Sequence, residues 1–454
     1  MARILPPEII REIYGYIHAP MRLHKLNDFP WHLGQICASW RSIFHSMASN
    51  FWNRLDIDLN VMDKYRDPEL VLHHYDDMLL ALHYFLNHTK GLPFSFQFNA
   101  RKHCSAKENE RMIRLFELLV AESFRWREIN IRFVSSLLPI LYKAKHHMPL
   151  LSSAQLVRVS YGANPQCMHD LFEDVPHLTR LELEAFSKWR VNWASLSVLK
   201  LGRGYEYDGQ LLSILGQAKR LEKLAIDESL ADYQDGITGP ISFPRLKVFS
   251  ITIHDAELLP FLRTPSLEEF YIQGFEEFEG LNRSQNKVIS FLTGSSCQLR
   301  CLSIAGCGAK FLTNILRCTP DLLHLNLGPD NCQDMLEYFN QLAFRRQGIP
   351  PLACHLRSLI VTDPGFSFME IVELAVLLAL RTEGVEDSSG IVPLEKLQKL
   401  MIIASSKGEL VQYNNRSTVK TLRQQCAEHG VEFTVQHERD MPLSFYDNMS
   451  ILDW

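Results

Sequence analysis

Large apolar residues recur along the chain in the order apolar-x-x-apolar-x-apolar, most often with leucine in the leading position. The last two apolar positions alternate with polar ones, which predicts a short strand with one buried face. A proline often comes just before the leading leucine, where a strand can begin without an N–H to donate. The clearest copies lie at 178–183, 196–201, 221–226, 246–251, 267–272, 299–304, 322–327, 356–361 and 397–402, and weaker copies lie at 52–57, 96–98, 126–131 and 157–159.

Between the predicted strands the apolar period changes to that of a helix. Apolar residues step by three and four over 72–86, 113–120 and 211–215, which predicts helices with one apolar face. Strand–helix–strand crossovers are almost always right-handed, so the strands should be parallel with the helices outside them. The fold expected over 53–435 is therefore α/β, a leucine-rich-repeat-like βα solenoid with parallel strands.

The irregular spacing of the copies leaves one alternative, an ordinary doubly wound α/β sheet. Successive strands are 18 to 41 residues apart, a wider range than the roughly 20–29 residues of regular leucine-rich repeats. Some repeats should therefore carry long helices or insertions. The solenoid is favoured because a doubly wound sheet has no reason to repeat one motif with its leading leucine. Residues 436–454 are expected to form a C-terminal tail or cap.

The first 52 residues carry a different pattern. Prolines predict the start of a first helix, where their missing N–H groups cost least, and Ile9, Ile13 and Ile17 then line one face. A second helix is expected over 31–44, with apolar residues four apart at Ile36, Trp40 and Phe44.

Three segments of this region resemble the F-box, in the order that the motif requires. They are Leu-Pro-Pro-Glu-Ile at 5–9, Ile-Cys-Ala-Ser-Trp-Arg at 36–41 and Phe-Trp at 51–52. Two departures are visible. The link over 18–30 is longer than usual, and Ala38 and Ser39 stand where basic residues are commoner.

The resemblance implies a three-helix F-box over 1–52 that docks a Skp-family adaptor, and through it a cullin-RING ubiquitin ligase. A unit of about 50 residues has little interior of its own, so several of its apolar side chains are expected to find a partner. The expected adaptor contacts are Leu5, Pro6, Ile9, Ile36, Cys37, Trp40 and Trp52.

The polar positions that alternate with the buried ones should point out of the sheet and bind the protein to be ubiquitinated. Their charges are of both signs, which favours a folded protein partner over a polyanion. For any one of these residues, an ordinary solvated surface side chain is the favoured alternative. The expected substrate-binding residues are Arg180, Glu182, Lys200, Lys223, Asp227, Glu269, Tyr271, Gln273, His324 and Asn326.

Composition narrows the class of partner. Lys and Arg (47) nearly balance Asp and Glu (52), so the basic field that a nucleic-acid binder needs is missing. The longest apolar run, 374–380, is far shorter than the roughly 18 residues of a membrane span. With no signal-peptide pattern at Met1 and ten scattered cysteines, we expect a reducing compartment, cytoplasmic or nuclear, and neither membrane nor nucleic acid as partner.

No catalytic, metal or cofactor site is expected. Gly202–Tyr205 lacks the Lys-Ser/Thr of a phosphate loop, and Cys297, Cys301 and Cys307 are four and six apart, which misses zinc-site spacing. A histidine and aspartate group at 73–77 has no matching partner set. The sequence thus predicts a non-catalytic ligase subunit. An interaction scaffold or small-ligand sensor outside a ligase stays open, and an enzyme with its own site is a third, weaker alternative.

Overall fold

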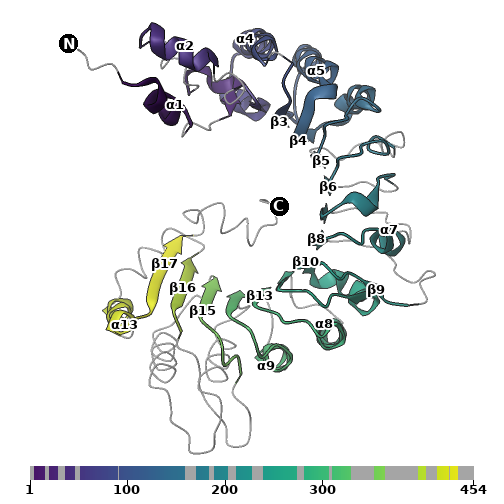
Figure 1. The fold of residues 1–454 in the computed structure, drawn as a ribbon, viewed down its shortest axis with the longest axis vertical. Helices are drawn as coiled ribbons and strands as arrows, with labels where there is room; N and C mark the ends of the chain where they lie inside the picture. Colours follow the sequence, from purple (N-terminus) through teal and green to yellow (C-terminus); the bar gives the residue numbers. More distant parts are fainter. Residues whose placement is uncertain are drawn as a thin grey trace, which may run out of the picture. The chain divides into compact units, whose positions relative to one another are not determined.

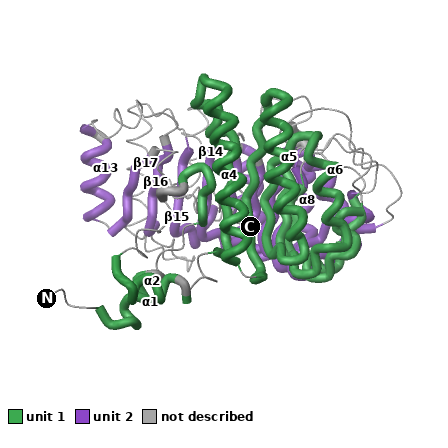
Figure 2. The backbone as a smooth tube through the Cα atoms, turned by 90° about the horizontal axis from the view of Figure 1, so that it is seen from above, with its two compact units in different colours: residues 1–196, 204–206 green, residues 197–203, 207–454 purple. Residues whose placement is uncertain are grey.

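The computed structural model describes most of the chain in segments, and the chain divides into two compact units (Figure 2). Unit 1 comprises residues 1–196 and 204–206, and unit 2 comprises 197–203 and 207–454. The described residues are 5–15, 20–28, 36–46, 52–89, 91–158, 170–183, 189–202, 211–226, 239–273, 281–305, 309–328, 352–362, 397–404, 417–428 and 430–437.

The strands of unit 1 form a parallel sheet in chain order, each pairing with the next one along the sequence. They are β1 (Met21–Arg22), β2 (Arg54–Asp58), β3 (Phe94–Asn99), β4 (Trp126–Phe133), β5 (Ser153–Arg158) and β6 (Arg180–Leu183).

The helices of unit 1 are α1 (Pro7–Gly15), α2 (Ala38–Ser46), α4 (Pro68–His88), α5 (Ala106–Ala121) and α6 (Leu138–Leu141). Short 3-10 turns join them to the strands: η1 (Leu23–Asp28), η3 (Leu59–Lys64), η4 (Ser123–Arg125), η5 (Ser135–Leu137), η6 (Tyr142–Ala144) and η7 (Trp193–Ser195). Figure 1 shows α4 and α5 on one side of the strands, so the opposite face of the sheet is not covered by them.

Unit 2 repeats the arrangement with a second run of parallel strands in chain order. They are β7 (Val198–Leu201), β8 (Lys223–Ile226), β10 (Val248–Thr252), β12 (Glu269–Gln273), β13 (Cys301–Ala305), β14 (His324–Gly328), β15 (Ser358–Thr362), β16 (Lys399–Ala404) and β17 (Glu432–His437). On the outer side lie α7 (Leu211–Gln217), α8 (Leu281–Ser295), α9 (Ala309–Cys318) and α13 (Ser417–Glu428), with η8 (Ile253–Phe261) and a small parallel pair, β9 (Ile241–Ser242) and β11 (Leu262–Arg263) (Figure 1).

Each position of the repeated motif has a fixed structural role. The leading leucine lies just before its strand, fully buried, and its amide closes a tight turn onto the carbonyl three residues earlier; Leu246 N to Phe243 O is one example at 3.4 Å, and Leu267 N to Thr264 O is another at 3.1 Å. The second and third apolar residues of the clearest copies fall inside the strand and are buried as well. The weak copy at 157–159 was wrong: β5 buries Leu156, and Val157 lies half-buried on the other face. The predicted α/β class, the parallel strands and the helices over 72–86, 113–120 and 211–215 are confirmed.

The first strand, β1, was not predicted. Residues of the long link between the two N-terminal helices form β1, whose Met21 and Arg22 pair with Leu55 and Asp56 of β2. Met21 is fully buried, while Arg22 lies on the uncovered face and pairs with Asp56 at 3.7 Å between Nε and Oδ2. The structure therefore joins residues 21–22 to the sheet, although the sequence places the domain boundary at residue 52.

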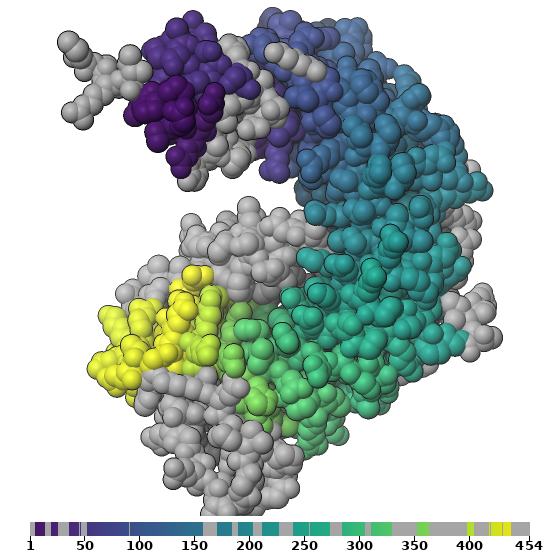
Figure 3. Space-filling view, viewed as in Figure 1, coloured from purple at the N-terminus to yellow at the C-terminus, as the bar shows by residue number. Residues whose placement is uncertain are grey.

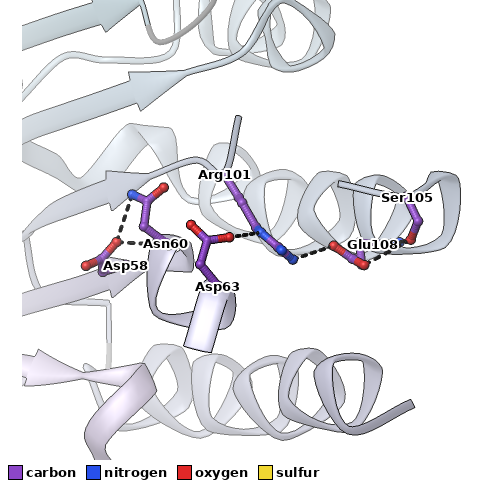
Figure 4. Close-up of polar contacts among 6 residues, drawn as sticks. All are labelled: Asp58, Asn60, Asp63, Arg101, Ser105 and Glu108. Carbon is purple, nitrogen blue, oxygen red and sulfur yellow. Dashed lines mark hydrogen bonds and ion pairs between the residues drawn. The ribbon is translucent and has the colours of Figure 1, made fainter. Parts of the chain in front are cut away.

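A polar network ties together the loops at the carboxyl ends of β2 and β3 (Figure 4). Arg101 donates from Nε to Asp63 Oδ1 at 2.6 Å and from Nη1 to Glu108 Oε2 at 2.7 Å. Ser105 caps the start of α5: its Oγ accepts from the Glu108 amide at 3.4 Å and its hydroxyl donates to Glu108 Oε1 at 3.1 Å. Asp58 accepts from the amide of Asn60 at 3.1 Å. These charges are satisfied within the chain, so we assign them a structural role.

Met21→Ala should loosen β1 from the sheet. Replacing a buried methionine by alanine typically costs about 2–5 kcal/mol, and in a repeat protein this loss acts on the neighbouring strand first. Hydrogen exchange should accelerate over 20–28 and 54–58 and stay unchanged over β5. Ile36→Ala, at an exposed position, is the matched control. Equal exchange in wild type and Met21→Ala would show that this side chain does not hold β1.

Candidate functional site

The two N-terminal helices pack on each other and leave apolar residues on their outer side. Ile10 of α1 and Ile43 and Phe44 of α2 are buried. Leu5 and Ile9, by contrast, are 41% and 42% exposed. In the space-filling view the side chains of α1 and α2 (purple) reach the surface of unit 1 (Figure 3).

The expected adaptor contacts therefore fall into two groups. Leu5, Pro6, Ile9, Ile36 and Cys37 are all exposed, with Ile36 reaching 56%. We call these five exposed residues the N-terminal apolar surface. Trp40 is half-buried in α2 and makes contacts within the chain. Leu5 and Pro6 precede α1, where the amide of Ile10 donates to the Pro6 carbonyl at 3.2 Å and starts the helix.

The sequence pattern placed Ile9 on the apolar face of the first helix, but the residue that α1 buries is Ile10. Neighbouring residues on a helix point about 100° apart, so this difference turns the helix enough to leave Ile9 in solvent. The second helix begins at Ala38, later than the expected start at residue 31. Ile17 lies outside the described residues.

Trp52 was expected to contact the adaptor, and the structure shows that it is an internal anchor. It is 2% exposed, and its ring lies 5.6 Å from Tyr84, 6.0 Å from Phe85 and 5.0 Å from His88 between centroids, all on α4. The reason lies in the repeat: Trp52 precedes Leu55 and Ile57 at the spacing of the leading leucine, the position that every described repeat buries. The repeat pattern, present in the sequence, outweighs the F-box resemblance here.

The uncovered face of each sheet, which we call the open face, carries the expected substrate-binding residues. In unit 1, Arg180 is exposed and Glu182 is half-buried on β6, in register with Ser153 and Gln155 of β5. In unit 2, Lys200 and Lys223 are half-buried on β7 and β8. Asp227 lies outside the described residues, and of Gln273 the structure describes only the backbone, in β12.

A polar cluster forms on the open face of β12 to β15. The register places Glu269, Cys301 and His324 in one row and Tyr271, Ser303 and Asn326 in the next. Tyr271 donates its hydroxyl to Glu269 Oε2 at 2.7 Å, and Asn326 donates from Nδ2 to Ser303 Oγ at 2.9 Å. Thr362 donates to the carboxamide oxygen of Asn326 at 3.4 Å. Four expected site residues are thus brought together.

Two members of this cluster are less accessible than expected. Tyr271, which the sequence placed among the outward contacts, is 6% exposed, and Asn326 is 7% exposed. The register neighbours of Tyr271 are the small residues Ser250 and Ser303. With its hydroxyl bonded to Glu269 on the same strand, the ring lies along the sheet and does not project from it. Of the four expected site residues, Glu269 and His324 remain accessible.

The electrostatics of the cluster do not favour nucleophilic chemistry. Burial, with the nearby Glu269 carboxylate as a second cause, raises the pKa of the Cys301 thiol to about 12, so the thiol stays protonated at neutral pH. Desolvation lowers the pKa of His324 below 6.5, against the opposing effect of Glu269, so the imidazole is neutral at pH 7 and above. The cluster can donate and accept hydrogen bonds, as a binding surface requires.

A groove lies on the helical side of unit 1, between α4 and α5. This groove of about 640 Å³ is lined by Leu79, Leu80 and Leu118, with charged residues at its rim, and Leu80 is 70% exposed. The charged rim residues pair with neighbouring side chains: Asp76 with Arg111 at 3.0 Å, Glu117 with Lys143 at 3.0 Å and Arg114 with Glu110 at 2.6 Å.

Within the described residues, no three histidine, cysteine or acidic side chains come together as a metal site would require. Of the three cysteines considered from the sequence, Cys307 lies outside the described part. Asp76, from the histidine and aspartate group on α4, forms the ion pair with Arg111. No described helix has the length and apolarity to cross a membrane.

Comparison with known proteins gives no family for this chain. No protein-family model matches the sequence, and no curated protein matches it.

The proton affinity of His324 should depend on Glu269. We expect its imidazole to titrate below pH 6.5 by NMR, and Glu269→Gln to lower that pKa further, because a carboxylate that favours the imidazolium is removed. Since the unfolded histidine takes up its proton near pH 6.5, the stability that neutral His324 contributes is present above that pH and is lost as the pH falls below it.

Glu110→Gln, in unit 1, is the matched control and should leave the titration unchanged. A His324 pKa that is the same in wild type and Glu269→Gln would contradict the arrangement of the cluster.

Proposed function

We propose that this protein is a non-catalytic substrate receptor of a cullin-RING ubiquitin ligase, whose N-terminal apolar surface docks a Skp-family adaptor. The observation that carries the proposal is the exposure of Leu5, Ile9 and Ile36 on a helix pair with little interior. These are the same residues that supply the apolar positions of the F-box resemblance. Covering them with a partner is favourable because large apolar groups leave water.

The free energy gained by burying each of these side chains on binding is modest, but the gains add up over the surface. Fully burying an isoleucine or leucine side chain is worth about 1.5–3 kcal/mol, and a side chain that is already about half covered gains roughly half of that. Three such residues contribute on the order of 3 kcal/mol. Pro6 and Cys37 extend the surface, so the interface is larger than these three residues.

The docking helices are tied to the sheet on both sides. Gly15 ends α1 and β1 begins at Met21, while Ser46 ends α2 and Trp52 is anchored under α4. Each link is only a few residues long, which leaves little slack between helix pair and sheet. A target on the open face of unit 1 would thus be held at a restricted distance from the adaptor, and a target lysine would be raised in effective concentration near the ubiquitin carrier.

Ile9→Glu combined with Ile36→Glu should abolish adaptor binding while the sheet stays folded. Each substitution places a charge in what would be a desolvated contact, and truncation at interface hot spots typically costs 2 kcal/mol or more. We expect binding of a purified Skp-family adaptor, measured by calorimetry, to weaken by about 1,000-fold or more for the double variant.

Leu80→Glu is the matched control, since Leu80 is even more exposed but lies on α4, in the groove beside α5. It should bind the adaptor like wild type. Full binding by the double variant, or equal loss in the control, would overturn the docking assignment.

A further inference from the structure

Three carboxamide side chains lie in a line across the open face of unit 1. The register pairs Gln97 of β3 with Asn130 of β4, and Asn130 with Gln155 of β5. All three residues are half-buried, so part of each residue remains accessible on this face. We call these residues the carboxamide ladder. Asp56 of β2 stands at one end of it and Glu182 of β6 at the other.

Several hydrogen-bond acceptors on and beside the ladder have no partner within the described chain. They are the carboxamide oxygens of Asn130 and of Asn99, and Oδ1 of Asp56. Buried acceptors of this kind are normally satisfied. The terminal torsion of an asparagine side chain is broad, so both carboxamides can turn toward a ligand. What they lack is an N–H donor.

The rest of this face excludes several classes of ligand. Among the described open-face positions of β2 to β5 no side chain is aromatic and only Val157 is apolar, so neither a stacked base or sugar nor an amphipathic helix finds an apolar platform. The charges there are also of both signs: Arg54 and Arg132 are basic, and Asp56, Asp58 and Glu128 are acidic. A polyanion or polycation would meet like charges along with opposite ones.

We propose that the carboxamide ladder binds the main chain of an extended polypeptide segment, one that is poor in apolar residues and crosses the strands of unit 1. A carboxamide carries both an acceptor and donors, which match the C=O and N–H of a peptide group whatever its side chain. The inference rests on the proposed function, to which it adds the class of target: an unfolded polar segment of a protein, recognised chiefly through its backbone.

The dimensions of the two partners agree. Neighbouring strands are about 4.8 Å apart, so Gln97 and Gln155 are separated by roughly 9.6 Å, and an extended peptide rises about 3.3 Å per residue. Three residues of the segment therefore span the ladder. Ser95 and Ser153 border it with small side chains, which leaves room for the segment, while Glu128 and Arg132 flank Asn130 along β4 and can meet polar side chains of either sign.

Selection from a display library of short linear peptides on the full-length chain tests the proposal. We expect polar peptides to be enriched, and Gln97→Ala with Asn130→Ala to weaken their binding by at least about tenfold, because hydrogen bonds to two side chains are lost. Methylating the main-chain nitrogens of an enriched peptide, one at a time, should weaken binding at successive positions, whereas exchanging its side chains should have smaller effects.

Gln424→Ala on α13, another exposed carboxamide, is the matched control and should bind like wild type. Hydrogen exchange over β4 reports whether the double variant keeps its sheet. If no peptide is enriched on wild type relative to the folded double variant, or if enriched peptides bind both equally, the proposal is overturned. Adaptor binding is measured separately on the same variants: its absence in wild type would refute the ligase function while leaving the peptide result to be judged by itself.

Discussion

Burial of the leading apolar residue of each repeat is the constraint on which the rest of the structure depends. A single strand with its helix cannot cover its own apolar face, so each repeat is stable only against its neighbours. The leading leucine closes the turn before its strand, and the following two apolar positions enter the sheet interior. Once these three positions are fixed, the alternating positions must point to the open face. Trp52 obeys this rule, which is why the first repeat and not a partner covers it.

The same constraint explains the start of the chain. The first edge of a parallel sheet has unpaired backbone groups that must be covered. Here the two-residue strand β1 pairs with β2 and buries the side chain of Met21. Short edge strands are a common way to limit further pairing. Because β1 comes from the link between α1 and α2, the helix pair is held next to the sheet without being part of its core. Its own interior is limited to a few residues such as Ile10 and Phe44, and Leu5, Ile9 and Ile36 stay outside.

Much of the fold could be predicted from the sequence, because each repeat is marked by apolar residues at a fixed spacing, usually with leucine in the leading position. The strands with a leading leucine and the helices α4 and α5 lie where the periodicity placed them. β1 could not be predicted, since two residues carry no period, and β17 alternates in the same way but has no leading leucine before it.

For the site, a period of two predicts which face of the sheet Tyr271 and Asn326 lie on. It does not predict how deeply they are buried, which depends on the size of neighbours in other strands. The sequence pattern placed Ile9 on the apolar face of α1, whereas the structure buries Ile10; both are isoleucine, and only packing against α2 decides which of them is buried. The carboxamide ladder was missed because Gln97 and Asn130 lie in weaker copies. Gln155 lies outside the copies altogether, since the strand there was predicted at 157–159 in the wrong register.

The most direct test of this account is hydrogen–deuterium exchange of the full-length chain with and without a purified Skp-family adaptor. The account predicts slower exchange over residues 5–13 and 36–44 in the complex, where the N-terminal apolar surface becomes covered, and no change over β3 to β5. Unchanged exchange in both N-terminal segments at saturating adaptor, or protection confined to the sheet, would contradict it.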